Sequence, residues 1–236
     1  MNIVDVLIIL IILCGAVVGF KRGVFKELVM TVGFLLVFII AFYLKNPLAE
    51  WMSLYLPFFS FGGIVSGVTA LNILLYQFIA FIIVFSILMI LFNILLTVTG
   101  WIEKILKFTI ILAIPSKLLG AIVGAIEGYI IAFMVVFLFN QPMLDIGIMN
   151  DSKFKDGMLE RTPILNKIVE GVEDTITDVY HLIEDNRYNK NENEINKQAI
   201  NAMLEHKVID VKYVEKLIDY GKIRIVGIDL VLNQYR

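Results

Sequence analysis

Four long apolar runs constrain the fold of this chain most strongly. They cover residues 3–20, 28–44, 72–98 and 118–139. A helix needs about 20 apolar residues to cross about 30 Å of hydrocarbon, and inside lipid only helices and closed barrels satisfy the backbone. Hydrophobic residues make up 59% of the chain and charged residues 18%, against about 45–50% and about 25% in soluble domains. The sequence therefore predicts an all-α, polytopic membrane protein with about four transmembrane helices in a lipid bilayer.

The segments that connect these runs carry separate signals. Residues 45–70 combine prolines and glycines with aromatic side chains, which is typical of a loop in the membrane interface. In residues 101–108 the charged side chains would lie on one side of a helix and the apolar side chains on the other, which predicts an interfacial helix there. Asp5 precedes the first run and Lys21-Arg22 follows it, the reverse of a cleavable signal peptide. We therefore expect an uncleaved first membrane helix.

The positive residues of the short loops predict an orientation. The loops after the first and third spans contain six Lys and Arg residues, whereas the loop after the second contains only Lys45. Because Lys and Arg concentrate in cytoplasmic loops, the first and third loops are expected in the cytoplasm. Both termini would then face outside.

The charge of the chain changes near residue 145. Residues before it include 7 Lys+Arg and 5 Asp+Glu, and residues from it onward include 13 and 17, which gives balances of +2 and −4. Residues 1–144 are therefore predicted to be the transmembrane domain. Residues 145–183 predict an amphipathic helical extension, and the Asn-rich residues 184–197 predict a linker. Residues 198–236 predict a small helical tail, with Asp210 as a helix cap.

Two similar glycine patterns lie within or at the edge of the first and fourth runs. They comprise Gly15, Gly19 and Gly23, and then Gly120, Gly124 and Gly128. Glycines four residues apart form a flat strip on one helix face, where a second helix can approach closely. Helix packing is the favoured interpretation, and a hinge beside a polar path is the alternative. The strips could face each other or the same strip in a second copy, so a homo-oligomer is expected.

Glu127 is the most unusual residue of the apolar runs. It lies between two of the glycines, about 15 Å from the cytoplasmic end of its span. A carboxylate at this depth must be protonated, paired or in a wet cavity. The sequence leaves two interpretations open, a proton or cation site and a neutral Glu that bonds to a neighbouring helix. Arg22 and Lys21 are candidate partners, and Asp5 is expected at the interface.

The third run carries a polar stripe. Asn72, Ser86 and Asn93 recur at multiples of seven residues, with Thr97 one turn beyond Asn93 and Gly100 continuing the face. Asn side chains in hydrocarbon usually bond across helices. We therefore expect this stripe to contribute to helix packing, with a solute path as the alternative.

The remaining residues give no indication of catalysis. Cys14 is the single cysteine, which excludes an internal disulfide and a multi-cysteine metal site. The two histidines, His181 and His206, lie in the polar tail. No P-loop or nucleotide fingerprint is present, and the acidic tail lacks a basic patch for nucleic acid. No enzyme activity, cofactor, metal or nucleic-acid partner is expected.

Two motifs combine glycines with charged residues. The first is Asp5 near the start, then Gly15-xxx-Gly19-xx-Arg22-Gly23 followed by Lys26-Glu27-Leu28, and the second is Pro115-Ser116-Lys117-Leu118-Leu119-Gly120-xxx-Gly124-xx-Glu127-Gly128. These motifs resemble those of the colicin V production (CvpA) family of bacterial membrane proteins. The resemblance covers about residues 1–170. It implies a multi-pass protein of the bacterial cytoplasmic membrane with a role in producing and exporting a peptide toxin, and it carries no catalytic residues over to this chain.

Two functional hypotheses follow. In the first, the protein supports toxin export or envelope homeostasis as a transporter-like or channel-like component. In the second, it is a membrane scaffold whose C-terminal tail recruits an unidentified protein partner. An intramembrane enzyme is the least supported class, because no nucleophile and base occur together.

Overall fold

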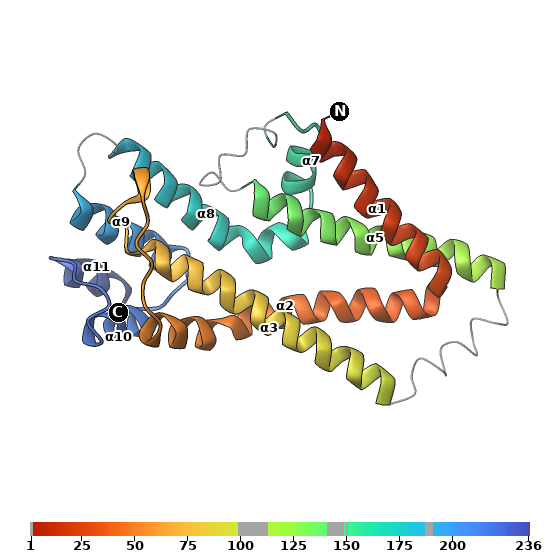
Figure 1. Cartoon of the computed structure of the whole chain (residues 1–236), viewed down its shortest axis with the longest axis horizontal. Coiled ribbons are helices and arrows are strands. Elements are labelled where there is room, and N and C mark those ends of the chain that lie inside the picture. Colours follow the sequence, from red (N-terminus) through yellow and green to blue (C-terminus); the bar gives the residue numbers. More distant parts are fainter. Residues whose placement is uncertain (1, 99–112, 141–148, 150, 187–190) are drawn as a thin grey trace. The chain divides into compact units, whose positions relative to one another are not determined.

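The computed structural model describes residues 2–98, 113–140, 149, 151–186 and 191–236. These residues form helices and connections without a strand, which confirms the predicted all-α class. The helices are α1 (Ile3–Arg22), α2 (Val24–Tyr55), α3 (Leu71–Val98), α5 (Ala113–Phe139), α7 (Lys155–Glu160), α8 (Pro163–Asp185), α9 (Glu192–Glu205), α10 (Val211–Asp219) and α11 (Ile228–Tyr235), with one 3-10 turn, η1 (Gly63–Val65) (Figure 1). The interfacial helix predicted over 101–108 lies outside the described residues.

Four of these helices are long and apolar enough to cross a membrane, as predicted. They are α1, α2, α3 and residues Pro115–Phe139 of α5, with mean hydropathies from 2.4 to 3.0. α2 has 32 residues, which corresponds to about 48 Å of helix. This length exceeds the hydrocarbon core of about 30 Å, so α2 extends beyond the apolar layer.

The predicted interfacial loop over 45–70 begins too early, because residues 45–55 belong to α2. α2 continues through Pro47 to Tyr55, and the connection to α3 is confined to residues 56–70. Proline normally interrupts a helix, but here Ala49 and Met52 are buried against Tyr76 and Ala80 of α3. The burial of these side chains outweighs the local cost of the proline.

The described residues of the predicted linker over 184–197 are also mostly helical. α8 ends at Asp185, and α9 begins at Glu192, with the side chain of Asn191 accepting a hydrogen bond from the backbone N–H of Glu194. The Asn-rich composition suggested a solvated chain, but its asparagines have structural roles. Asn196 accepts hydrogen bonds from the backbone N–H of Ala70 and the hydroxyl of Thr69, so it caps the start of α3.

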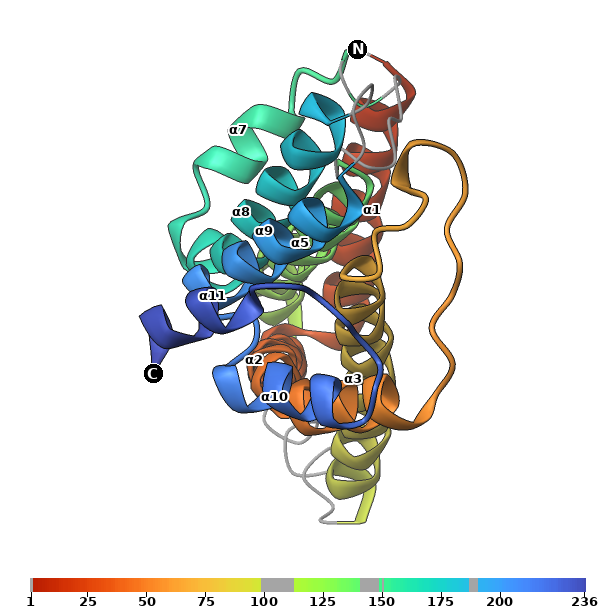
Figure 2. The same cartoon turned by 90° about the vertical axis from the view of Figure 1, so that its left-hand side faces the viewer.

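The chain divides into two compact units that do not follow the predicted boundary at residue 144. The first contains residues 1–40 and 85–166, and the second contains residues 41–84 and 167–236. α2 and α3 each contribute to both units because the boundaries fall inside these helices. In the second unit α10 lies against the C-terminal part of α2 (Figure 2), where the hydroxyls of Ser53 and Tyr213 are 2.5 Å apart.

Candidate functional site: a carboxyl cluster behind two glycine strips

The first unit is built around the contact between α1 and α5, which run side by side (Figure 1). The glycine strips of these two helices face each other. Gly15 lies opposite Gly124 and Gly19 opposite Gly120, so the two helices are antiparallel. A Cβ atom added at Gly124 would lie 2.9 Å from the Cα of Gly19, and one added at Gly128 would lie 2.8 Å from the carbonyl oxygen of Ile11. The two backbones therefore touch, and neither strip is left for the predicted contact with a second copy.

Gly23 turns the chain from α1 into α2. Its φ of 78° lies in the region that favours glycine, and its N–H donates to the carbonyl oxygen of Gly19 at 2.8 Å. The hydroxyl of Ser116 accepts a hydrogen bond from the N–H of Val24 at 3.3 Å. This turn brings the first residues of α2 beside the start of α5.

Glu27 lies at the centre of this corner with 1% of its side chain exposed. Its carboxylate is 3.3 Å from the guanidinium of Arg22, and the carboxyl group of Glu127 lies close enough to interact with it electrostatically. The hydroxyl of Thr31, one turn along α2, donates to Glu127 at 2.9 Å. A Cβ at Gly124 would lie 3.0 Å from the Glu27 carboxylate, so that glycine also provides room for the acid.

We call Arg22, Glu27, Thr31 and Glu127 the carboxyl cluster. Two neighbouring carboxylates repel each other, and Arg22 supplies one positive charge beside them. The cluster therefore concentrates two acidic groups and one cation within a segment that is otherwise apolar.

Arg22, a candidate partner of Glu127 from the sequence, forms its ion pair with Glu27. Glu27 lies in the first turn of α2 and is buried beside Arg22. Thr31 was not singled out, although its spacing of four from Glu27 puts both on one helix face. Lys21 is exposed and forms no ion pair within the described chain.

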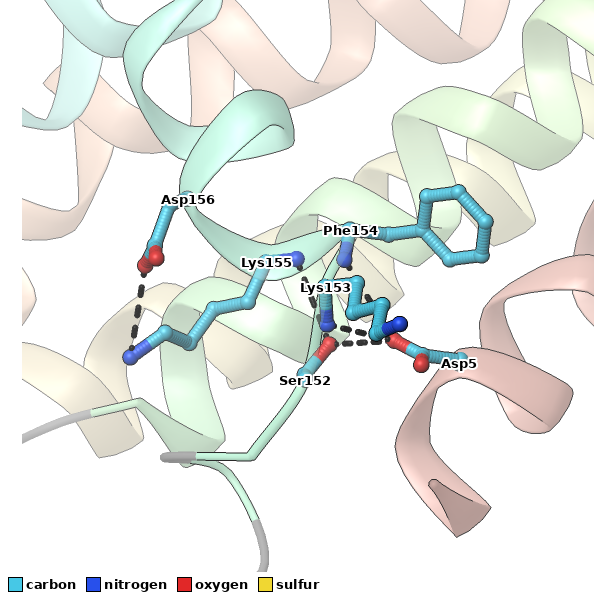
Figure 3. Close-up of polar contacts among 6 residues, drawn as sticks. All are labelled: Asp5, Ser152, Lys153, Phe154, Lys155 and Asp156. Atoms are coloured by element: carbon cyan, nitrogen blue, oxygen red, sulfur yellow. Dashed lines mark hydrogen bonds and ion pairs between the residues drawn. The ribbon is translucent and has the colours of Figure 1, made fainter. Parts of the chain in front are cut away.

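Asp5 lies near the opposite end of α1 and has a structural role. It is fully buried, and one carboxylate oxygen accepts hydrogen bonds from the hydroxyl of Ser152 at 2.7 Å and from the backbone N–H groups of Lys153 and Phe154 at 3.0 and 3.3 Å (Figure 3). Its other oxygen accepts from the N–H of Asn2 at 3.0 Å in a capping box. Asp5 thus joins the start of α1 to the segment before α7.

The predicted polar stripe of α3 does not form one packing surface. Asn72 is buried and bonds to the backbone of Phe59. Ser86 and Asn93 are exposed, and the amide of Asn93 donates to the carbonyl oxygen of Met89 in its own helix. The stripe therefore serves a loop contact at one end and local helix bonding at the other, while Gly100 lies outside the described residues.

Comparison with known proteins identifies one family. A family model described as colicin V production protein matches residues 4–162, which includes the glycine strips, the carboxyl cluster and Asp5. No curated protein and no solved structure matches the chain. The match ends directly before α8, so α8, α9, α10 and α11 fall outside the shared region.

Proposed function

Because this chain belongs to the colicin V production protein family, we propose that it is a transporter-like or channel-like component of the bacterial cytoplasmic membrane. The family and the four apolar helices make it a membrane protein involved in colicin V production. We propose further that it acts in export of the toxin or in envelope homeostasis, without an enzymatic step. The loop charges favour both termini outside.

The carboxyl cluster carries this proposal, because it places Glu27 against Arg22 and Glu127 against Thr31. Two acids and one Arg give the cluster a net charge of zero when one acid is protonated and −1 when both acids are ionised. A net charge in hydrocarbon is costly, and intramembrane carboxyl groups mark proton and ion pathways. Protonation therefore switches the cluster between a state that tolerates close helix packing and a state that requires water or a cation.

A charge-neutral substitution tests this role. Glu127→Gln keeps a hydrogen-bonding side chain but removes the titrating group, so we expect loss of complementation in a strain that lacks its own family member, scored by colicin V release. Membrane levels of the variant should equal those of the wild type. Infrared difference spectra between low and high pH should also lose a carboxylic C=O band.

Glu160→Gln is the matched control, because Glu160 is exposed at the end of α7 and belongs to the same unit. It should leave both release and the infrared band unchanged. Full colicin V release by the Glu127→Gln variant would refute the proton role, whatever the spectra show.

The scaffold remains the second candidate because of one feature of the tail. Val226, just before α11, is 82% exposed, and Leu230, within α11, is 73% exposed. A protein partner could bury these two apolar side chains. Replacing both with serine should abolish function if the tail recruits a partner. Normal colicin V release by this double variant would exclude a partner at these residues.

A further inference from the structure

The second unit contains a cavity of about 430 Å³ outside the carboxyl cluster. Its lining includes Asn46 and Glu50 of α2, Gln77 of α3, and Lys207 and Asp210 from the turn between α9 and α10. Pockets that hold small molecules occupy about 300–1,000 Å³. The cavity is thus large enough for a compact organic ligand.

Lys45 fixes the direction of two amide groups in the lining. Its side chain is buried, and its ammonium donates to the side-chain oxygens of Asn46 at 3.1 Å and Gln77 at 2.5 Å. An ammonium group has donors and no acceptor, so both amide oxygens must face Lys45. The NH₂ groups are therefore the parts of these amides that remain to bind a ligand.

Lys207 adds a positive charge in an unusual backbone conformation. Its φ of 57° makes it the one residue other than glycine with a positive φ among those described. This conformation is unfavourable for residues that carry a Cβ, and such strain is common at binding sites. A glycine would suit the turn better, so the lysine side chain is kept at a conformational cost.

The two carboxylates of the lining already have partners. Glu50 pairs with Lys216, and Asp210 accepts a hydrogen bond from the backbone N–H of Tyr213 at 2.8 Å. Among the charged and amide side chains of the lining, the groups left for a ligand are therefore two NH₂ groups and one ammonium, which favour an anion. A doubly charged phosphate is less favourable than a monocarboxylate, because Glu50 and Asp210 repel two negative charges more strongly than one.

We propose that this cavity binds a small organic monocarboxylate with a short apolar body. The carboxylate takes the NH₂ groups of Asn46 and Gln77 and the ammonium of Lys207. The buried aliphatic side chains of Val208 and Ile209, which also line the cavity, contact the apolar body. This site belongs to a different unit from the carboxyl cluster, so the proposal does not depend on a role in proton transfer.

Calorimetric titration of the full chain in lipid nanodiscs tests the proposal. The probes are a series of monocarboxylates from butyrate to phenylpropionate, their neutral amides, and the corresponding alkyl phosphates, each also titrated into empty nanodiscs. At least one carboxylate should bind with a dissociation constant below about 1 mM, and its amide should not. Failure of every carboxylate at that limit, or equal binding of the amide, would overturn the assignment, and tighter binding of a phosphate would overturn its monocarboxylate class.

Variants at Lys207 separate binding from folding. Lys207→Gly removes the ammonium and also relieves the strained backbone, so it should weaken carboxylate binding about tenfold, or 1.4 kcal/mol, in a protein that is at least as stable as the wild type. Lys212→Gln removes an exposed lysine of α10 outside the lining and should leave affinity within about twofold. Unchanged affinity of the Lys207→Gly variant would refute the role of Lys207 and the proposed site.

Discussion

Substituting Gly124 with alanine tests the packing that underlies the carboxyl cluster. The new Cβ would fall on the carbonyl oxygen of Gly15, 2.9 Å from the Cα of Gly19 and 3.0 Å from the carboxylate of Glu27. Two of these neighbours are backbone atoms, which cannot turn aside as a flexible side chain can. The helices themselves must therefore separate.

The required shift sets the expected cost. Carbon atoms pack favourably at about 3.5–4.0 Å, so relieving the 2.9 Å contact requires the two helices to move apart by about 0.6–1.1 Å. A gap of this size at the other contacts between the helices forfeits a quarter to a half of the attraction of each contact. Overpacking in well-packed cores typically costs about 1–3 kcal/mol. We expect a loss in this range, together with displacement of Glu27 from Arg22.

Reversible unfolding in mixed micelles of mild detergent and dodecyl sulfate, followed by circular dichroism, measures this loss. Gly157→Ala is the matched control, because a Cβ at Gly157 meets nothing within 4 Å and alanine is the better helix former by roughly 0.5–1 kcal/mol. Gly124→Ala should destabilise and Gly157→Ala should not. A free energy of unfolding within about 0.5 kcal/mol of the wild type for Gly124→Ala would refute the close-packing argument.

Three further predictions use the same unfolding assay. Asp5→Ala leaves the donors of Ser152, Lys153 and Phe154 without their acceptor and should cost about 2 kcal/mol; an equal loss with Asp5→Asn would show that charge, not hydrogen bonding, matters. Tyr213→Phe removes the bond to Ser53 and should cost about 1 kcal/mol, and no loss would argue against a buried bond. Burial, and the nearby charges of Asp174 and Glu170, raise the pKa of Glu173. The folded state therefore binds the Glu173 proton more tightly than the unfolded state does. The free energy of unfolding then falls as the pH rises above the usual pKa of a Glu. Glu173→Gln should raise the free energy of unfolding at pH 7 but not below about pH 4, and the opposite pH dependence would contradict burial as the cause.

The helix packing could be predicted from sequence because its signal is local and periodic. Glycines at intervals of four put a flat strip on one face of a helix wherever that helix lies, and the similarity of the two strips indicated that they could meet. Glu127 was equally visible, because a carboxyl group between such glycines has few ways to be accommodated in lipid. These inferences required no knowledge of the connecting turns.

The partner of Glu127 could not be predicted in the same way. Glu27 follows Lys26 in a charged segment, where charge alone suggests a surface position. Its burial depends on the turn at Gly23, whose direction sets Glu27 against α5. Similarly, composition alone predicted a loop at Pro47 and a linker in the Asn-rich segment. The packing of Ala49 and the hydrogen bonds of Asn196 instead favour helices at these two places.

The cap that Asn196 provides for α3 has a consequence for biosynthesis. Its amide oxygen and the N–H of Ala70 are 126 positions apart in the chain, and at about 5–20 residues per second the ribosome supplies Asn196 about 6–25 s after Ala70. Two membrane crossings, by α3 and α5, must return the chain to its starting side before the bond can form. The second unit can therefore be completed only late in synthesis, after membrane insertion has determined on which side each segment lies.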